Sequence, residues 1–543
     1  MNIKRKKELG RFFLWKQGKT GQKSFQAQAK EYLDLVMPVH TLGAVSLVFI
    51  LASVLMFLFL DKKSLWLDEA FSVTMAQQDW TTLLRILSEG EANMGLYYIL
   101  LKWWVNIGQS EFVVRSLSVL FALATVPMAY ALGARLFGLQ VGIITALLLT
   151  VNAFFIRYAQ EARGYSLVLL LVTLSSYFFV KSIERPSRKL WIAYIISSVL
   201  AVYAHFFAVI VLLAHTISLV FLRRQNVSWK GLVVSGVIII LLLVPLVLFI
   251  LSRGNVGLGW IHQPNLYSIY QLFYELVGRG GRLLLVVYLI PCSIAFFLAV
   301  RTWLGSKTSL NTWRYTFLLI WLFIPIIIAF SYSFIEPIFW PRFFIICLLP
   351  LVLSASVGLC YIRYPWVFAT ILIILIVLSG RAVIGWYSGY DKEGGEDWRS
   401  ATRLVVSMIQ PGDTVLFFPP YVSLPFDYYL HRLGSRDKIP DAIYRSSGTY
   451  IASRFQKGRW PDLDRSFLDQ LSVQYRRVWI IVRNLHRLEN QHNHFILSLQ
   501  SKYKLVETRQ LKKITVLLYD ISPLESQLYE KSQGEVPIGL MQN

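Results

Sequence analysis

Long apolar runs recur through the first two thirds of this 543-residue chain. A helix needs about 20 predominantly apolar residues to cross the hydrocarbon core of a bilayer. The first run extends from about His40 to Leu60, and the others begin near Phe112, Leu139, Ser166, Trp191, Phe206, Gly231, Leu283, Arg314, Phe343 and Pro365. Only 16% of the residues are charged, fewer than in typical soluble domains. We therefore predict a polytopic α-helical membrane protein with about eleven transmembrane helices.

The polar connectors between the runs alternate in charge. Those on the same face as the N-terminus, such as "RTWLGSKTSLNTWR", are basic, and the opposite face receives nearly all the acids of the membrane half. The positive-inside rule makes the basic face cytoplasmic. We therefore predict a cytoplasmic basic tail at 1–39 and a transmembrane domain at 40–388 with a first outer loop at 61–111. The formal charge of +23 needs no nucleic acid partner, because this asymmetry explains it.

The composition becomes polar after about Arg381. The helix-like stretch "EDWRSATRLVVSMI" is followed by three strand-like stretches, "TVLFFP", "RVWIIVR" and "ITVLLYDI". An odd number of spans places this part on the face opposite the N-terminus. We therefore predict a small extracytoplasmic α/β domain at 389–543.

Two adjacent acids, Asp68 and Glu69, lie in the first outer loop within "SLWLDEAFSV". Their apolar and aromatic neighbours suggest a partly dry position at the membrane surface. A carboxylate in such a position can serve as a general base, and its neighbour can orient an acceptor. The alternative is that Asp68 caps the helix that follows it, since Asp is a favoured N-cap residue.

The other outer loops carry further ionisable residues near the ends of spans. The stretch "RYAQEARGYSL" contains Glu161 and Arg163, and "WPRFFIICLLP" contains Arg342. Arginine suits phosphate oxygens because its guanidinium donates in a fixed fork. The alternatives are an ion pair between Glu161 and Arg157, and arginines that anchor to lipid headgroups.

Metal binding has little support in the sequence. All three cysteines lie in apolar runs, so we expect neither a disulfide nor a cysteine metal site. His205 in "YAHFF" is a candidate ligand, with a packing role as the alternative. We assign no metal site, and dependence on a divalent metal stays open.

Several stretches together resemble a known family of membrane enzymes. In chain order they are "LWLDEAFS", the stretch from "LYYILLKWW" to "ALGARLFG", "RYAQEARGYSL" and "PRFFIICLLPLVLSASVGL". They are similar to the bacterial GT-C fold glycosyltransferases related to protein O-mannosyltransferases and to the aminoarabinose transferase of lipid A. The chain departs from these relatives before "LYY", where Asn93 and Met94 replace a frequent His-Pro-Pro.

The resemblance implies transfer of a sugar from a polyprenyl-phosphate donor, with Asp68 acting in catalysis. We expect an integral protein of the bacterial inner membrane that acts on the outer face. The acceptor is then a hydroxyl of a lipid, glycan or protein, and inversion is the simplest outcome. The catalytic candidates are Asp68 and Glu69; the donor-phosphate candidates are Arg163, Arg342, Arg279 and Arg282; and the substrate-binding candidates are Glu161, Gln160, Tyr165, Tyr97 and His205. The alternatives are an oligosaccharide polymerase or ligase of the same membrane class and a non-enzymatic lipid or sugar transporter.

Overall fold

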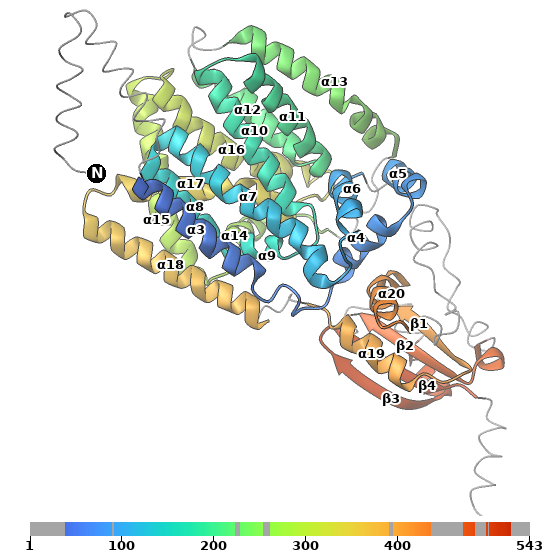
Figure 1. The fold of residues 1–543 in the computed structure, drawn as a ribbon. Coiled ribbons are helices and arrows are strands. Elements are labelled where there is room, and N and C mark those ends of the chain that lie inside the picture. Colours follow the sequence, from blue (N-terminus) through green and yellow to red (C-terminus); the bar gives the residue numbers. More distant parts are fainter. Residues whose placement is uncertain are drawn as a thin grey trace, which may run out of the picture.

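The computed structural model describes residues 39–89, 92–222, 228–253, 261–389, 395–418, 420–435, 471–483, 496–497 and 499–522. The predicted cytoplasmic tail lies outside these residues except for its last position. Figure 1 shows a bundle of helices with a small β-sheet region at one end.

Eight segments among the described residues are long and apolar enough to cross a membrane. They are α3 (Val39–Phe57), α7 (Glu111–Phe137), α10 (Tyr165–Glu184), α13 (Trp229–Arg253), α15 (Arg282–Gly305), α16 (Leu310–Tyr332), the consecutive helices η3 (Pro341–Cys347) and α17 (Leu348–Tyr361), and α18 (Pro365–Ser388). The helices α8 (Leu139–Thr150) and α9 (Ala153–Ala159) form a pair bent by 64°, which makes a ninth span if it is counted as one.

Two further helices occupy the positions of the remaining predicted spans. They are α11 (Arg188–Ala204) and α12 (Ala208–Ser218), the latter continued by the short 3₁₀ helix η1 (Leu219–Phe221). Both lie within the bundle beside α10 (Figure 1). The polytopic helical architecture is therefore confirmed, whereas length and composition alone support eight or nine spans among the described residues and not eleven.

The spans differ in how much of their surface is covered by protein. The most apolar window of Pro341–Tyr361 is 94% buried, whereas the corresponding window of α18 is 17% buried. Small residues in "LSASVG" explain the central position of α17, because they let a neighbouring backbone approach closely. At Gly358 an added Cβ would overlap the backbone of Pro291 on α15. The helices η3 and α17 therefore form the centre of the bundle, and α18 has a lipid-facing surface.

The predicted first outer loop contains three short helices, α4 (Leu67–Gln77), α5 (Trp80–Glu89) and α6 (Gly95–Trp104). A fourth short helix, α14 (Leu266–Leu276), precedes α15 and packs near η3. The connectors assigned to one face of the membrane meet at one end of the bundle. For example, the loop after α9 bonds to the end of α3, since the Gln160 amide donates to the Leu58 carbonyl at 2.8 Å.

The C-terminal region forms a four-stranded sheet in the order β1-β2-β4-β3. Its strands are β1 (Asp413–Phe418), β2 (Arg477–Arg483), β3 (Lys504–Leu511) and β4 (Ile514–Asp520). The β1–β2 pair is parallel, and the other two pairs are antiparallel. The predicted helix is α19 (Trp398–Met408), and the three predicted strands are β1, β2 and β4. The edge strand β3 and the helix α20 (Ser423–Arg432) were not predicted.

Helix α20 brings the C-terminal region against the predicted first outer loop. It packs on both α19 and α4, as Figure 1 shows. Alternate residues of the strands pack on opposite faces of the sheet: Val415 and Phe417 join the core shared with α19, whereas Leu416 and Phe418 pack with Leu471 on the other face. The sheet thus faces the beginning of the loop that carries Asp68.

Candidate functional site

The two adjacent acids occupy the first turn of α4. The helix begins at Leu67, with Trp66 as its N-cap residue. The Trp66 amide donates to Glu69 Oε2 at 3.2 Å, so Glu69 and not Asp68 satisfies the backbone at this helix end. The alternative in which Asp68 caps the helix is therefore wrong, because the helix already includes Asp68.

Glu69 is fully buried and accepts hydrogen bonds at both of its oxygens. Arg115 on α7 donates from Nε to Oε1 at 2.7 Å and from Nη2 to Oε2 at 2.6 Å. The backbone amide of Ala162 also donates to Oε1, at 3.0 Å. Glu69 thus joins α4, α7 and the loop before α10. This geometry suits a residue that positions the site better than one that contacts an acceptor.

Arg115 was not among the residues selected from the sequence. Besides pairing with Glu69, its guanidinium donates to the carbonyls of Leu60, Lys63 and Ser64 at 2.8, 2.8 and 3.0 Å. It therefore holds the whole segment that leads from α3 to α4. The sequence could have indicated Arg115, because it is a charged residue one turn inside an apolar span. A charge in such a position is costly, so the residue is usually paired or functional.

Asp68 pairs directly with one of the predicted phosphate-binding arginines. Arg342 Nη1 lies 2.9 Å from Asp68 Oδ2, and the side chains of Arg342 and Asp68 are 16% and 25% exposed. Arg342 comes from the first turn of η3 and lies over the rings of Trp66 and Phe343, 5.9 and 5.7 Å from their centroids. The cation of η3, at the centre of the bundle, therefore pairs with the acid of α4.

Arg163 approaches Asp68 from a third element. Its Nη1 donates to the Asp68 carbonyl at 3.3 Å, to Ser72 Oγ at 3.4 Å and to the Tyr98 hydroxyl at 3.1 Å. The loop that carries it packs tightly, because a Cβ at Gly164 would lie 3.3 Å from Met94. Tyr98 is a second residue that the sequence reasoning missed.

Tyr97 contacts the loop that carries Arg163 through Ser118. Its hydroxyl shares a hydrogen bond of 2.9 Å with Ser118 Oγ, which donates to the Arg163 carbonyl at 3.2 Å. Tyr97 is fully buried. The predicted substrate-binding role of Tyr97 stays a prediction, and the observed contacts place it in the support of the loop.

Apart from atoms of the two arginines, four polar atoms around this arrangement are buried and have no hydrogen-bond partner among the described residues. They are Trp66 Nε1, Glu161 Oε2, the Tyr165 hydroxyl and His205 Nε2. A buried polar group without a partner costs about 1–3 kcal/mol, so four together point to a polar ligand. The ring centroids of Tyr165 and His205 are 6.1 Å apart, and that of His205 lies 5.3 Å from that of Phe343, the neighbour of Arg342.

His205 is neutral in this environment. Burial and then the nearby charges of Arg163 and Arg342 lower the pKa of the imidazole to about 3. Its Nδ1 accepts a hydrogen bond from the Phe207 amide at 3.2 Å, which leaves the ring proton on Nε2. The Nε2–H of His205 is thus a donor that a ligand oxygen can use.

Glu161 is held by a weak pair with Arg157, whose Nε lies 3.4 Å from Oε1. This is the i, i+4 pair that the sequence offered as an alternative to a site role. Burial raises the pKa of Glu161, an effect that Arg157 opposes. Since Oε2 has no partner among the described residues, the ion pair and a ligand contact are compatible.

The remaining predicted residues have other surroundings. Gln160 donates to the Met56 and Leu58 carbonyls and accepts from Trp386 Nε1 at 2.8 Å, so it ties together α3, α18 and the α9–α10 loop. Arg279 pairs with Glu275 on α14, and Arg282 is exposed at the start of α15. Their predicted binding roles stay predictions.

The departure from the family pattern at Asn93 also has a structural role. Asn93 Oδ1 accepts from the Phe206 amide at 3.2 Å and so fixes the turn that carries His205. Within the described ranges, no three His, Cys, Asp or Glu side chains lie together as a metal site would require.

Comparison with known proteins supports the resemblance that the sequence motifs indicated. Residues 95–249 match the family model of dolichyl-phosphate-mannose-protein mannosyltransferases. No curated protein matches the chain in sequence. Among solved structures, ArnT from Cupriavidus metallidurans bound to undecaprenyl phosphate has 13% identity and a TM-score of 0.59, over 88% of this chain and 98% of that chain.

Two other similar structures are those of an oligosaccharyltransferase and an arabinofuranosyltransferase. The Archaeoglobus fulgidus oligosaccharyltransferase AglB, in complex with an inhibitory peptide and a dolichol-phosphate, has 9% identity and a TM-score of 0.50, over 92% of this chain and 75% of that chain. The mycobacterial arabinofuranosyltransferase AftD has 15% identity and a TM-score of 0.50, over 90% of this chain and 40% of that chain. The predicted GT-C fold is thus confirmed.

Proposed function

We propose that this membrane glycosyltransferase of the GT-C fold moves a sugar from a polyprenyl-phosphate donor to an acceptor hydroxyl, with Asp68 as general base. The observation that carries the proposal is the 2.9 Å contact between Asp68 and Arg342, with Arg163 bonded to the backbone of Asp68. The proposed proton acceptor is thus in direct contact with both of the proposed phosphate-binding arginines.

The charges of this group suit the departure of a phosphate. A sugar on a polyprenyl phosphate is a phosphodiester with one negative charge, and the polyprenyl phosphate that leaves carries about two. Arg342 and Arg163 supply two cations, and their guanidinium forks match phosphate oxygens. Preorganised groups of this kind typically contribute about 100- to 1000-fold in rate.

The reaction then follows from these positions. The acceptor hydroxyl transfers its proton to a carboxylate oxygen of Asp68 while its oxygen attacks the anomeric carbon. The bond between that carbon and the phosphate oxygen breaks, and the electron pair leaves with the phosphate. A single displacement inverts the anomeric configuration. The donor phosphate takes over the guanidinium of Arg342, which frees Asp68 Oδ2 to accept the proton.

The unpartnered polar atoms have a natural role in holding the sugar. His205 Nε2–H and Trp66 Nε1–H donate, Glu161 Oε2 accepts, and the Tyr165 hydroxyl can do either. Sugar hydroxyls need partners of both kinds. We assign Glu69 a positioning role, because its oxygens are occupied by Arg115, Ala162 and Trp66.

We also propose that the site faces the extracytoplasmic side of a bacterial inner membrane, with the C-terminal region on the same side. The basic connectors support this orientation through the positive-inside rule. The site is formed by the connectors of the opposite, acid-bearing face. Nucleotide sugars are cytosolic, so an outward-facing transferase needs a donor that a lipid carries across the membrane.

The donor assignment is tested by mass spectrometry of lipids that co-purify with the detergent-extracted protein. We expect a polyprenyl phosphate or its sugar derivative in the wild type and much less of it in Arg342→Ala. Asp79→Asn is a matched control, since Asp79 is an exposed acid of the same loop that caps α5 through the Thr82 amide. Equal amounts of lipid in Arg342→Ala and in the control variant would exclude Arg342 from the donor site.

A further inference from the structure

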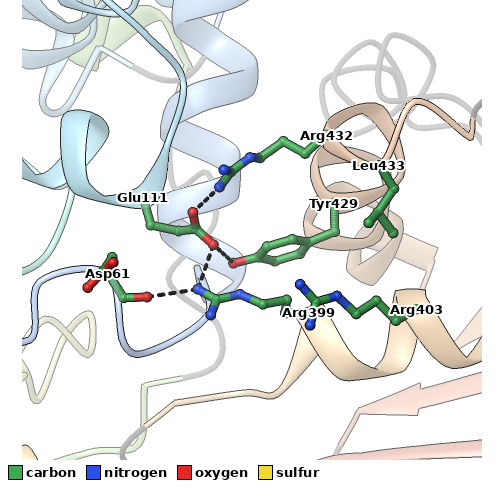
Figure 2. Close-up of a pocket in the computed structure, with 7 residues that line it drawn as sticks. All are labelled: Asp61, Glu111, Arg399, Arg403, Tyr429, Arg432 and Leu433. Atoms are coloured by element: carbon green, nitrogen blue, oxygen red, sulfur yellow. Dashed lines mark hydrogen bonds and ion pairs between the residues drawn. The ribbon is translucent and has the colours of Figure 1, made fainter.

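A polar cavity lies between the membrane bundle and the C-terminal region. It measures about 300 Å³ and is lined by Asp61, Glu111, Arg399, Arg403, Tyr429, Arg432 and Leu433. Figure 2 shows that its walls come from the loop after α3, the start of α7, and the two helices α19 and α20. None of these residues belongs to the arrangement around Asp68.

Both carboxylate oxygens of Glu111, the glutamate in the wall of this cavity, already accept hydrogen bonds. Glu111 Oε1 accepts from Arg399 Nη2 at 2.7 Å and from the Tyr429 hydroxyl at 3.0 Å, and Oε2 accepts from Arg432 Nη1. Its side chain is 5% exposed. Glu111 therefore joins the membrane bundle to both helices of the C-terminal region and has little capacity for another cation.

The cavity carries more positive charge than its carboxylates offset. Three arginines face two acids, and one of those acids, Glu111, is occupied by Arg399 and Arg432. Arg399 also donates to the Asp61 backbone carbonyl at 2.8 Å. Each guanidinium has five N–H donors, so most of them stay available.

Arg403 is the arginine with the most donors available. It lies one helix turn after Arg399 on α19, and Figure 2 shows the two side chains next to each other. Like charges at i, i+4 on a helix repel. No carboxylate of the described residues forms an ion pair with Arg403, whose side chain is exposed to the solvent. Both arginines therefore present N–H donors to the same cavity.

We propose that this cavity binds a phosphate group at the level of the lipid headgroups, as a site separate from the donor site. Phosphate suits the arginine forks, and the volume accommodates it with part of its substituent. Asp61 follows α3 closely and Glu111 begins α7, so the cavity lies where transmembrane helices leave the bilayer. The phosphate comes either from an anionic phospholipid headgroup or from a phosphorylated molecule in solution.

Occupancy of this site is linked to the loop that carries Asp68. The Tyr429 hydroxyl, in the wall of the cavity, accepts from the Leu65 amide at 2.8 Å, three residues before Asp68. A bound phosphate neutralises the repulsion between Arg399 and Arg403 and so strengthens the docking of α19 and α20 on this loop. Phosphate binding therefore stabilises the junction between the membrane bundle and the C-terminal region.

The test uses the full-length protein in two arms. In the lipid arm, the protein is placed in nanodiscs of phosphatidylcholine with or without phosphatidylglycerol, and bound lipid is counted by native mass spectrometry. In the soluble arm, the thermal midpoint is measured in detergent during titration with inorganic phosphate. We compare the wild type with Arg403→Ala and Arg403→Glu, and with Arg509→Ala, which removes an exposed arginine of the distant strand β3.

We expect wild type and Arg509→Ala to behave alike, Arg403→Ala to bind about tenfold more weakly, and Arg403→Glu to lose binding. A response in the lipid arm alone identifies a headgroup as the source, and a response to inorganic phosphate shows that the phosphate group suffices. Because Arg403 is exposed, has no ion pair among the described residues and repels Arg399, its variants should fold and unfold at or slightly above the wild-type thermal midpoint without phosphate. Wild-type affinity of Arg403→Glu in both arms, or no response of the wild type in either arm, would overturn the proposal.

Discussion

The adjacent acids Asp68 and Glu69 should respond to the same kind of substitution in opposite ways. Replacing each carboxylate by its amide keeps the size of the side chain and removes its charge. Asp68 pairs with Arg342 where the side chains are 25% and 16% exposed, so water partly screens the pair and its loss costs less than the loss of a fully buried pair. Glu69 and Arg115 have side chains that are 1% and 5% exposed, and breaking a buried pair costs about 3–5 kcal/mol.

We therefore expect Asp68→Asn to lose much less stability than Glu69→Gln and to lose activity by roughly 100-fold or more, the usual scale for a general base. Glu69→Gln should lower the free energy of unfolding by about 3–5 kcal/mol, because the buried Arg115 cation loses its counter-charge. Stability is measured by thermal unfolding of the detergent-solubilised protein, and activity by sugar transfer from a polyprenyl-phosphate sugar at a temperature where both variants are folded.

A double variant makes the comparison more specific. Arg115→Met combined with Glu69→Gln removes the cation that Glu69→Gln leaves unpaired, so its loss of stability should be smaller than the sum of the two single losses. The reasoning is refuted if Glu69→Gln unfolds at the wild-type temperature, or if Asp68→Asn is as unstable as Glu69→Gln. An active Asp68→Asn protein would exclude Asp68 as the base.

Three further predictions follow from other contacts. Arg342→Ala should lower the rate of sugar transfer about 100-fold or more. Arg342→Lys should recover part of this rate, because Lys has the charge without the forked guanidinium. Near-wild-type turnover of Arg342→Ala would instead indicate that Arg342 only anchors to lipid headgroups. Tyr429→Phe should lower kcat and cost about 1–3 kcal/mol, because the Leu65 amide loses its acceptor. Tyr428→Phe loses the bond to the Gln109 carbonyl and the contact from Arg432 Nη1 but none to Leu65, so it should keep kcat; equal kcat values would disprove this coupling. Burial, and then the charge of Lys512, lower the pKa of Lys63 from 10.5 to about 7 in the folded protein, so the unfolded chain binds more protons between these pH values. Thermal stability should therefore rise between pH 7 and 10.5 in the wild type, and rise less in Lys63→Met. Identical pH profiles of the two proteins would contradict this prediction.

The features predicted correctly from the sequence are those encoded locally along the chain. A run of about 20 apolar residues forms a helix that fits the bilayer wherever it packs, so the helical membrane architecture could be predicted. The helix α19 and the strands β1, β2 and β4 carry their own patterns in the same way. The edge strand β3 was missed because its side chains are mostly exposed, and exposure removes the apolar pattern that identifies a strand.

The sequence also identified residue types whose positions are costly without a function. Acids and arginines at the ends of spans need a partner or a function there. By this criterion the sequence identified Asp68, Glu161, Arg163 and Arg342 as candidates. The resemblance implied the catalytic role for Asp68, and Glu69 was expected to orient the acceptor. No pattern along the chain indicated that Glu69 is instead buried against Arg115.

Tertiary structure alone decided which side chains meet. Asp68 and Arg342 are 274 positions apart, and Leu65 and Tyr429 are 364 positions apart. Contacts over such separations depend on how α7, η3 and α20 pack around the first outer loop, and no local pattern encodes that packing. The same packing buries Glu69 against Arg115 and leaves Asp68 partly exposed. One acid thereby becomes a support of the fold and its neighbour the candidate base, because burial and charge pairing, not residue type, separate the two.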